Sequence, residues 1–160
     1  MGRTTARSYG STMQTHTPPQ PTSDTRTDAM IAALESGDID AVVACYAEDG
    51  RQIHPLSPDP IVGRAQIRES DGALMAAFPD VRVERRTVAA VGTTLVIELV
   101  LAATNTGDLD LGDGQTLPAT GRTLRLPCVW VLDLDAAGLI TEERAYFDTA
   151  EFFRQLGLQD

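Results

Sequence analysis

Basic residues are scarce in this sequence, and long apolar runs are missing. Lys and Arg number 13 against 23 Asp and Glu, which gives a formal net charge of −10. Such a charge repels phosphate backbones, so we expect no nucleic-acid partner. No apolar run approaches the roughly 20 residues that span a bilayer, and the N-terminus lacks the apolar core of a secretory signal. We therefore expect a cytoplasmic protein without a membrane partner.

Cysteine and histidine are also rare, which limits metal and redox chemistry. Cys45 and Cys128 both lie in apolar segments, so we expect reduced thiols in the core rather than a disulfide framework. The two histidines, His16 and His54, have no partner at a metal-ligand spacing. The glycines within 106–115 lack the strand–loop–helix context of a phosphate loop. The sequence thus implies no metal and no cofactor.

What the chain does contain is enough apolar sequence for one folded domain. Hydrophobic residues make up 42% of it, as in ordinary globular proteins. Residues 1–23 are rich in Thr, Ser, Gly and Pro and have little to bury. We expect a disordered tail there, whose removal would leave the melting temperature almost unchanged. Residues 24–160 are expected to form the single domain.

Apolar periodicity divides this domain into a helical part and a strand-rich part. Three segments with helical spacing precede Pro79, and one short strand interrupts them. After Pro79 the period changes to two, until a last helix begins behind Asp148 as its N-cap. Helices followed by an antiparallel meander predict an α+β fold whose helices cover one face of the sheet. The expected helices are 24–36, 38–46, 63–78 and 149–156, and the expected strands are 51–54, one starting at 81, 95–103, 123–134 and 140–147.

Four segments carry a resemblance to one superfamily. The run GDIDAVVACYAEDGRQIHPLSPDPIVGRAQI at 37–67 resembles the opening of ketosteroid isomerases and other NTF2-like proteins. FPD at 78–80, PATGR at 118–122 and YFDTAEFFRQLGL at 146–158 resemble SnoaL-like polyketide cyclases. The resemblance implies a cone-shaped, curved antiparallel sheet with three N-terminal helices and a short C-terminal helix around one apolar pocket. This fold hosts isomerases, cyclases, epoxide hydrolases and binding proteins.

The catalytic positions of these families hold other residues here. The general base of the isomerases, an Asp before the Pro that ends the first strand, falls at His54, and their oxyanion-hole residues fall at Met30 and Trp130. The His and Asp of the cyclases fall at Trp130 and Ala145. The Arg-x-Asp of the epoxide hydrolases is replaced by Val-Leu-Ala at 100–102. The resemblance therefore implies a variant that lacks the usual catalytic sets.

Strand alternation predicts which side chains face the pocket, because successive residues of a strand point to opposite faces. Four strands each contribute two or more side chains to the expected lining of the pocket. The expected inward residues are Gln52 and His54 in the first strand, Glu98, Val100 and Ala102 in the second, Leu126, Cys128, Trp130 and Leu132 in the third, and Glu143, Ala145 and Phe147 in the fourth.

Two of these side chains suit proton transfer. His54 titrates near neutral pH and stands where the isomerases hold their base; the alternative is that it caps the strand end. Glu98, in the apolar strand VIELV, is a partner for His54, part of a structural ion pair, or turned to solvent. Trp130 is expected to pack on a flat polycyclic or polyene ligand; the alternative is a core or dimer-interface residue. Glu143 is interpreted mainly as a solvated charge and alternatively as a residue at the mouth of the pocket. The expected substrate-binding residues are Gln52, Cys128, Trp130, Glu143, Ala145 and Phe147.

The expected function is that of a SnoaL-like cyclase or isomerase in secondary metabolism, such as antibiotic biosynthesis. It would act on an apolar, polyketide-derived intermediate, with His54 and Glu98 as catalytic residues. A cyclase of this kind could also work without acid–base residues, mainly by holding a reactive chain folded inside the apolar pocket. The alternative is a non-catalytic small-molecule-binding or chaperone-like NTF2-like protein. We also expect a homodimer through the convex face of the sheet, where an apolar patch would form from Leu99, Leu101, Val131 and Tyr146.

Overall fold

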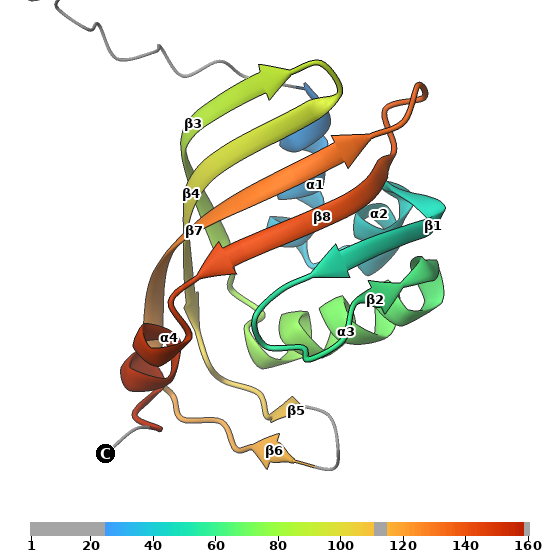
Figure 1. Ribbon diagram of the computed structural model, residues 1–160. Helices are drawn as coiled ribbons and strands as arrows, with labels where there is room; N and C mark the ends of the chain where they lie inside the picture. Colours follow the sequence, from blue (N-terminus) through green and yellow to red (C-terminus); the bar gives the residue numbers. More distant parts are fainter. Residues whose placement is uncertain (1–24, 111–114, 159–160) are drawn as a thin grey trace, which may run out of the picture.

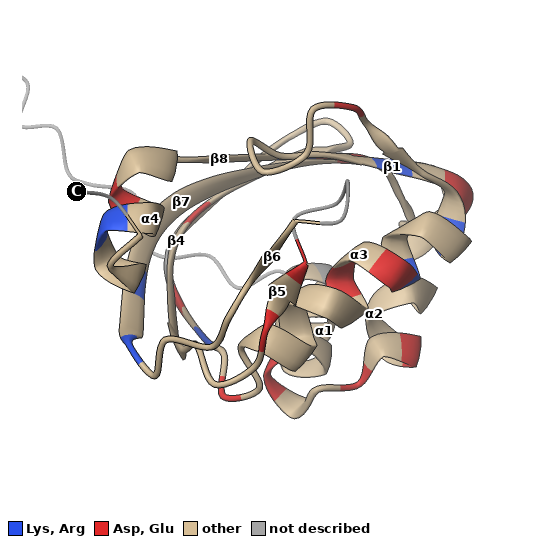
Figure 2. Cartoon of the chain, turned by 90° about the horizontal axis from the view of Figure 1, so that it is seen from below, with Lys and Arg blue, Asp and Glu red and all other residues tan. Residues whose placement is uncertain are grey.

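The computed structural model describes residues 25–110 and 115–158, so the predicted tail at 1–23 lies outside the described residues. A curved sheet bends around one side of the protein, and α1, α2 and α3 pack on its concave side (Figures 1 and 2). None of the helices in the described ranges is long and apolar enough to cross a bilayer. The helices are α1 (Thr25–Ser36), α2 (Ile39–Ala44), α3 (Gly63–Ala77) and α4 (Thr149–Leu156), and the strands are β1 (Tyr46–Ile53), β2 (Ile61–Val62), β3 (Arg82–Val91), β4 (Thr94–Thr104), β5 (Leu109–Asp110), β6 (Thr116–Leu117), β7 (Thr123–Leu134) and β8 (Ile140–Phe147).

The main sheet has six strands in the order β2-β1-β8-β7-β4-β3. Its long central strands, β4 and β7, are rich in Val and Leu, which suit a pleated and largely buried surface. Neighbouring strands are antiparallel except β1 and β8, which run parallel. This parallel pairing sets Gln52 beside Glu143. Two polar residues 91 positions apart in the chain thus lie next to each other.

The first strand begins earlier than the sequence predicts. The second helix was expected to reach Tyr46, but α2 ends at Ala44 and Tyr46 is the first residue of β1. The pairing of β1 with β8 is irregular between Tyr46 and Arg51, and at Gly50 a Cβ atom would lie 2.8 Å from the carbonyl oxygen of Ile140. Only glycine permits this approach. The irregularity hides the period of two that would have shown Tyr46 to be in a strand.

The predicted third and fourth helices are confirmed. The third, α3, spans Gly63–Ala77, within one residue of the predicted end. The fourth, α4, begins behind Asp148, whose carboxylate accepts a hydrogen bond of 3.0 Å from the backbone N–H of Glu151. It ends at Gly157, whose φ of 73° lies in the left-handed region that favours glycine. Both helices are placed by local chemistry that the sequence shows.

The strand β4 faces the interior with the opposite set of residues from the predicted one. Its odd-numbered residues Leu95, Ile97 and Leu99 are fully buried, whereas Glu98 is exposed. The register explains this, because Ile97 lies directly opposite Trp130 of β7, and directly opposite residues share a face of the sheet. Trp130 is 6% exposed and faces inward as predicted. The predicted inward positions of Glu98, Val100 and Ala102 are therefore wrong.

The convex face carries a different set of β4 residues from the predicted one, because Val96 and Val100 turn to it in place of Leu99 and Leu101. Leu99 and Leu101 are buried or line the interior, so two of the four predicted apolar contacts are absent from this face. Tyr146 remains, with 56% of its surface exposed. Next to Tyr146 on the same face of β8, Arg144 forms ion pairs with Asp133 and with Glu142. A homodimer through this face stays a prediction, and a monomer mass in light scattering at micromolar concentration would contradict it.

Candidate active site

A cavity of about 170 Å³ lies between the concave face of the sheet and the helices. It is comparable in size to an engineered cavity of about 150 Å³ that encloses benzene. Most of its lining is aliphatic or aromatic, and the polar side chains are few. This composition is typical of sites for small organic molecules. The aromatic and polar lining residues are Phe78, Trp130, Phe147, Phe152, Tyr46, Gln52, His54, Asp71 and Glu143.

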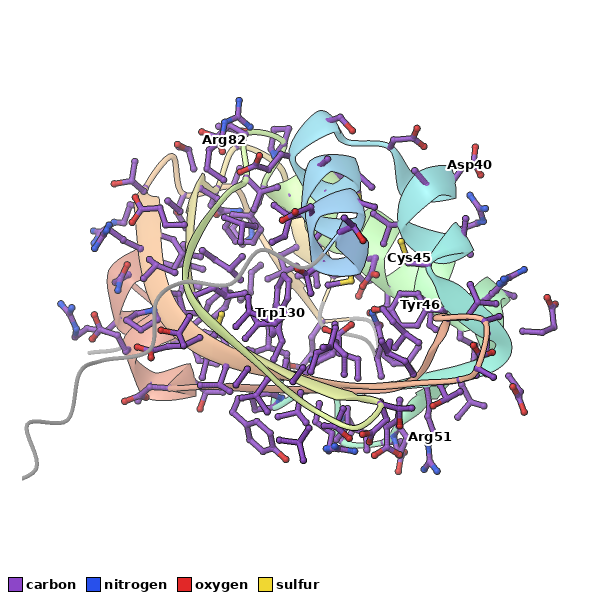
Figure 3. All side chains as sticks on the ribbon, turned by 90° about the horizontal axis from the view of Figure 1, so that it is seen from above. Asp40, Cys45, Tyr46, Arg51, Arg82 and Trp130 are labelled. Atoms are coloured by element: carbon purple, nitrogen blue, oxygen red, sulfur yellow. The ribbon has the colours of Figure 1, made fainter. Side chains whose placement is uncertain are left out.

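The structure brings together six of the eight predicted site residues. Gln52 and His54 at the end of β1, Trp130 of β7, and Glu143, Ala145 and Phe147 of β8 all line the cavity. Figure 3 shows Tyr46 and Trp130 inside the molecule between the sheet and the helices, with Arg51 on the opposite side of the sheet. Strand alternation therefore places β1, β7 and β8 correctly.

Two predicted site residues lie elsewhere. Glu98 is exposed on the other face of β4, so it is not placed to assist His54. Cys128 faces inward but packs within the hydrophobic core rather than lining the cavity. Burial, and to a lesser degree the charge of Glu143, raises the pKa of the Cys128 thiol to about 12. Cys128 is thus a buried, unreactive thiol.

A chain of hydrogen bonds crosses the polar end of the cavity. The Tyr46 hydroxyl donates to the carboxylate of Glu143. The side-chain nitrogen Nε2 of Gln52 donates to the Tyr46 hydroxyl oxygen at 2.8 Å and to Oδ2 of Asp71 at 3.0 Å. The Nε atom of Arg64 holds the start of β1 in place through a 2.9 Å bond to the Tyr46 carbonyl. The four residues of the chain itself, Tyr46, Gln52, Asp71 and Glu143, are buried, and they come from β1, α3 and β8.

Burial gives the two carboxyl groups unusual acidities. Loss of solvent raises the pKa of Asp71 from 3.8 to about 7; the charge of Glu143 adds to this rise, and the Gln52 hydrogen bond opposes it. Burial also raises the pKa of Glu143, against the effect of hydrogen bonds from Tyr46 and Gln52. The pKa of Tyr46 is raised well above its usual value by burial and by both carboxylates, so this hydroxyl keeps its proton. Asp71 is therefore the group that exchanges a proton near neutral pH.

His54 supplies a second ionisable group at the same cavity. Burial lowers the pKa of its imidazole, which keeps the ring neutral at neutral pH. Its Nε2 atom is buried and has no hydrogen-bond partner. A buried polar atom without a partner is unfavourable, and because His54 lines the cavity, a ligand bound there would supply the missing partner.

Sequence reasoning missed Asp71 and Tyr46 as members of the site. Asp71 stands four residues after Ile67 and seven before Phe78, on the buried stripe of α3. A carboxylate in the apolar stripe of a helix is the signal that would have identified it. Glu143 was placed inward by alternation but interpreted mainly as a solvated charge. It is 8% exposed because Tyr46 provides it with a donor inside the protein.

Within the described ranges, no group of three or more His, Cys, Asp and Glu side chains is placed to hold a metal ion. Four of the polar residues of the cavity are joined to one another by hydrogen bonds: Tyr46, Gln52, Asp71 and Glu143.

Comparison with known proteins agrees with this architecture. A hypothetical protein with a ketosteroid isomerase-like fold from Catenulispora acidiphila, in complex with trimethylamine, superposes with a TM-score of 0.71 at 20% identity, over 86% of this chain and 96% of that one. A proposed SnoaL-like polyketide cyclase from Jannaschia sp. CCS1 gives 0.70 at 19% identity, over 89% and 100%. The epoxide hydrolase/cyclase-like enzyme SalBIII, which has a role in pyran ring formation in the polyether salinomycin, gives 0.64 at 21%, over 79% and 91%.

These likenesses are below 25% identity and concern the fold. No sequence among curated proteins matches the chain. The family assignment comes from the sequence itself, which matches the SnoaL-like domain over residues 27–143, most of the described part of the chain. The curved sheet and the helices on its concave side agree with that match, and the chain belongs to the SnoaL-like domain family.

Proposed function

We propose that this protein is an acid–base enzyme, a SnoaL-like cyclase or isomerase that acts on an apolar, polyketide-derived intermediate. One observation carries the proposal: Asp71, with a pKa raised to about 7, lies in the wall of an apolar cavity. A general base works best when its pKa lies near the working pH, and burial is the usual means of moving a carboxyl group there.

The geometry suits a reaction with two proton transfers. Ionised Asp71 removes a proton from a carbon next to a carbonyl group, which leaves an enolate. In an isomerisation the proton returns at another atom; in a ring closure the enolate carbon attacks a second carbonyl, and the resulting alkoxide takes up a proton. The proton that Asp71 has taken up returns to the product, and the Nε2 atom of the neutral His54 ring is the second group, which donates a hydrogen bond to the reacting oxygen. Trp130 and Phe147 shape the apolar wall against which the substrate packs.

The buried polar chain argues for catalysis over binding alone. A cavity that only stores an apolar ligand gains nothing from two carboxyl groups, because buried charges destabilise the fold. Here Asp71 and Glu143 are kept, with donors arranged around them by Gln52 and Tyr46. Strained or costly polar groups of this kind are concentrated at functional sites.

Proton abstraction can be tested with 5-nitrobenzisoxazole, a small apolar probe. Removal of its ring C–H proton by a base breaks the N–O bond and releases a coloured cyanophenolate. We expect kcat/KM to rise with pH and to level off above about 7, because Asp71 must be ionised to act as the base. The measurement is the initial rate of colour formation between pH 5 and 9.

The position of the inflection identifies the base. A midpoint below the usual imidazole pKa of 6.5 would assign the proton to His54, whose pKa is lowered by burial. A rate no greater than that of the buffer at every pH would contradict the proposal and support the non-catalytic binding protein.

A further inference from the structure

The polar end of the cavity has more hydrogen-bond acceptors than donors. The donors are the Tyr46 hydroxyl and the amide nitrogen of Gln52, and each is already engaged within the chain of hydrogen bonds. The acceptors include both carboxyl groups, of Asp71 and Glu143. The amide is oriented with Nε2 toward Asp71, as a carboxylate acceptor requires. When both carboxyl groups are ionised, this end of the cavity therefore lacks a donor.

The side-chain carbonyl oxygen of Gln52 is the acceptor that lacks a hydrogen-bond donor. Gln52 is 5% exposed, and its Oε1 atom is buried and has no hydrogen-bond partner. Buried side-chain oxygens are nearly always paired, with protein, water or ligand. Because Gln52 lines the cavity, a donor group of a bound ligand is the partner that we infer for this oxygen.

The charges of the lining also have one sign. Asp71 and Glu143 are the acidic residues of the wall, and no Lys or Arg among the described side chains lines the cavity. The potential at this end is negative whenever either carboxyl group is ionised, and apolar walls strengthen it. Trp130 also lines the cavity, and an indole ring attracts cations over its face in a desolvated site.

We propose that the cavity selects ligands with a positively charged amine or quaternary ammonium head on an apolar body. The head lies at the Gln52, Asp71 and Glu143 end, where it compensates the carboxylate charge and, in a protonated amine, supplies the missing donor. The apolar body packs along Trp130 and Phe147. The inference goes beyond the proposed acid–base reaction, since it concerns the charge of the ligand and does not require turnover.

Choline and its uncharged isostere 3,3-dimethyl-1-butanol test the proposal, because they differ in the atom that carries the charge. Trp130 is the single tryptophan of the chain, so its emission reports binding in this cavity. At pH 8 we expect choline to bind about tenfold more tightly than the isostere, or better. This preference should decrease between pH 8 and pH 5.5, because Asp71 takes up a proton as the pH falls through about 7.

Charge-removing variants locate the effect. Asp71→Asn and Glu143→Gln are each expected to reduce the preference for choline while binding of the isostere persists, which shows that the variant is folded. Glu69→Gln is the matched control, because Glu69 is an exposed carboxylate on the same helix, two residues from Asp71. It should leave the preference unchanged.

Three results would overturn the proposal: equal affinities for the two probes at pH 8, a preference that survives both buried substitutions, or no binding of choline at all. Its failure is distinct from that of the proposed function. An enzyme that converts 5-nitrobenzisoxazole with an inflection near pH 7 but binds both probes equally would keep the function and lose the charge selectivity.

Discussion

Replacing Asp71 by Asn is expected to lower kcat/KM for 5-nitrobenzisoxazole by about two to four orders of magnitude, the usual contribution of a general base. Asparagine has nearly the shape of aspartate and still offers an oxygen to Nε2 of Gln52, so the cavity wall is retained. What it lacks is the lone pair basic enough to take a proton. The initial rate at pH 8, where the carboxylate is ionised, gives the largest contrast.

Two further variants make this result specific. Glu69→Gln removes a charge from the solvent face of the same helix and should keep the full rate. His54→Gln should retain the inflection near pH 7, because Asp71 is unchanged. If Asp71→Asn keeps the wild-type rate and His54→Gln loses it, the base is His54 and the role given to Asp71 is wrong.

The same Asp71→Asn substitution should change how stability depends on pH. The folded protein holds the Asp71 proton up to about pH 7, whereas the unfolded chain releases it near 3.8. Between these values the folded state binds more protons, so stability from this group is present at low pH and is lost as the pH rises to 7. The change in pKa corresponds to a loss on the order of 4 kcal/mol.

Urea denaturation at pH 4, 6 and 8 measures this effect as a difference between proteins. The free energy of unfolding of Asp71→Asn relative to wild type should increase steadily between pH 4 and 7 and stay level above it, because the variant has no carboxyl group to ionise. Glu69→Gln, made in parallel, should show no such trend. A difference that is constant across the pH range would mean that Asp71 ionises at its ordinary pKa.

The sequence predicts the fold and most of the cavity wall because both depend on short-range patterns. Helical spacing and the Asp148 cap locate α3 and α4, and alternation places Trp130 and Ala145 inward. Such signals need only a few neighbouring residues. The family resemblance, which the match over residues 27–143 confirms, adds the curvature of the sheet and an apolar cavity, and the structure has both.

The errors arise where the outcome depends on pairing between distant segments. Whether Glu98 or Ile97 faces inward is set by the register of β4 against β7, and a one-residue difference reverses every side chain of the strand. Tyr46 is hidden by the irregular pairing around Gly50. Asp71 has a local signal, a carboxylate on the apolar stripe of a helix, but its importance comes from Gln52 and Glu143, which only the folded chain brings beside it.

The central claim is that Asp71 exchanges a proton near neutral pH inside the cavity, and the most direct test is its own titration. Carbon-13 NMR of a protein labelled at the aspartate side-chain carboxyl carbons follows each carboxyl group from pH 3 to 9. The Asp71→Asn variant identifies the resonance that belongs to Asp71. The structure predicts a midpoint of about 7, and a midpoint near the ordinary value of 3.8 would contradict the account.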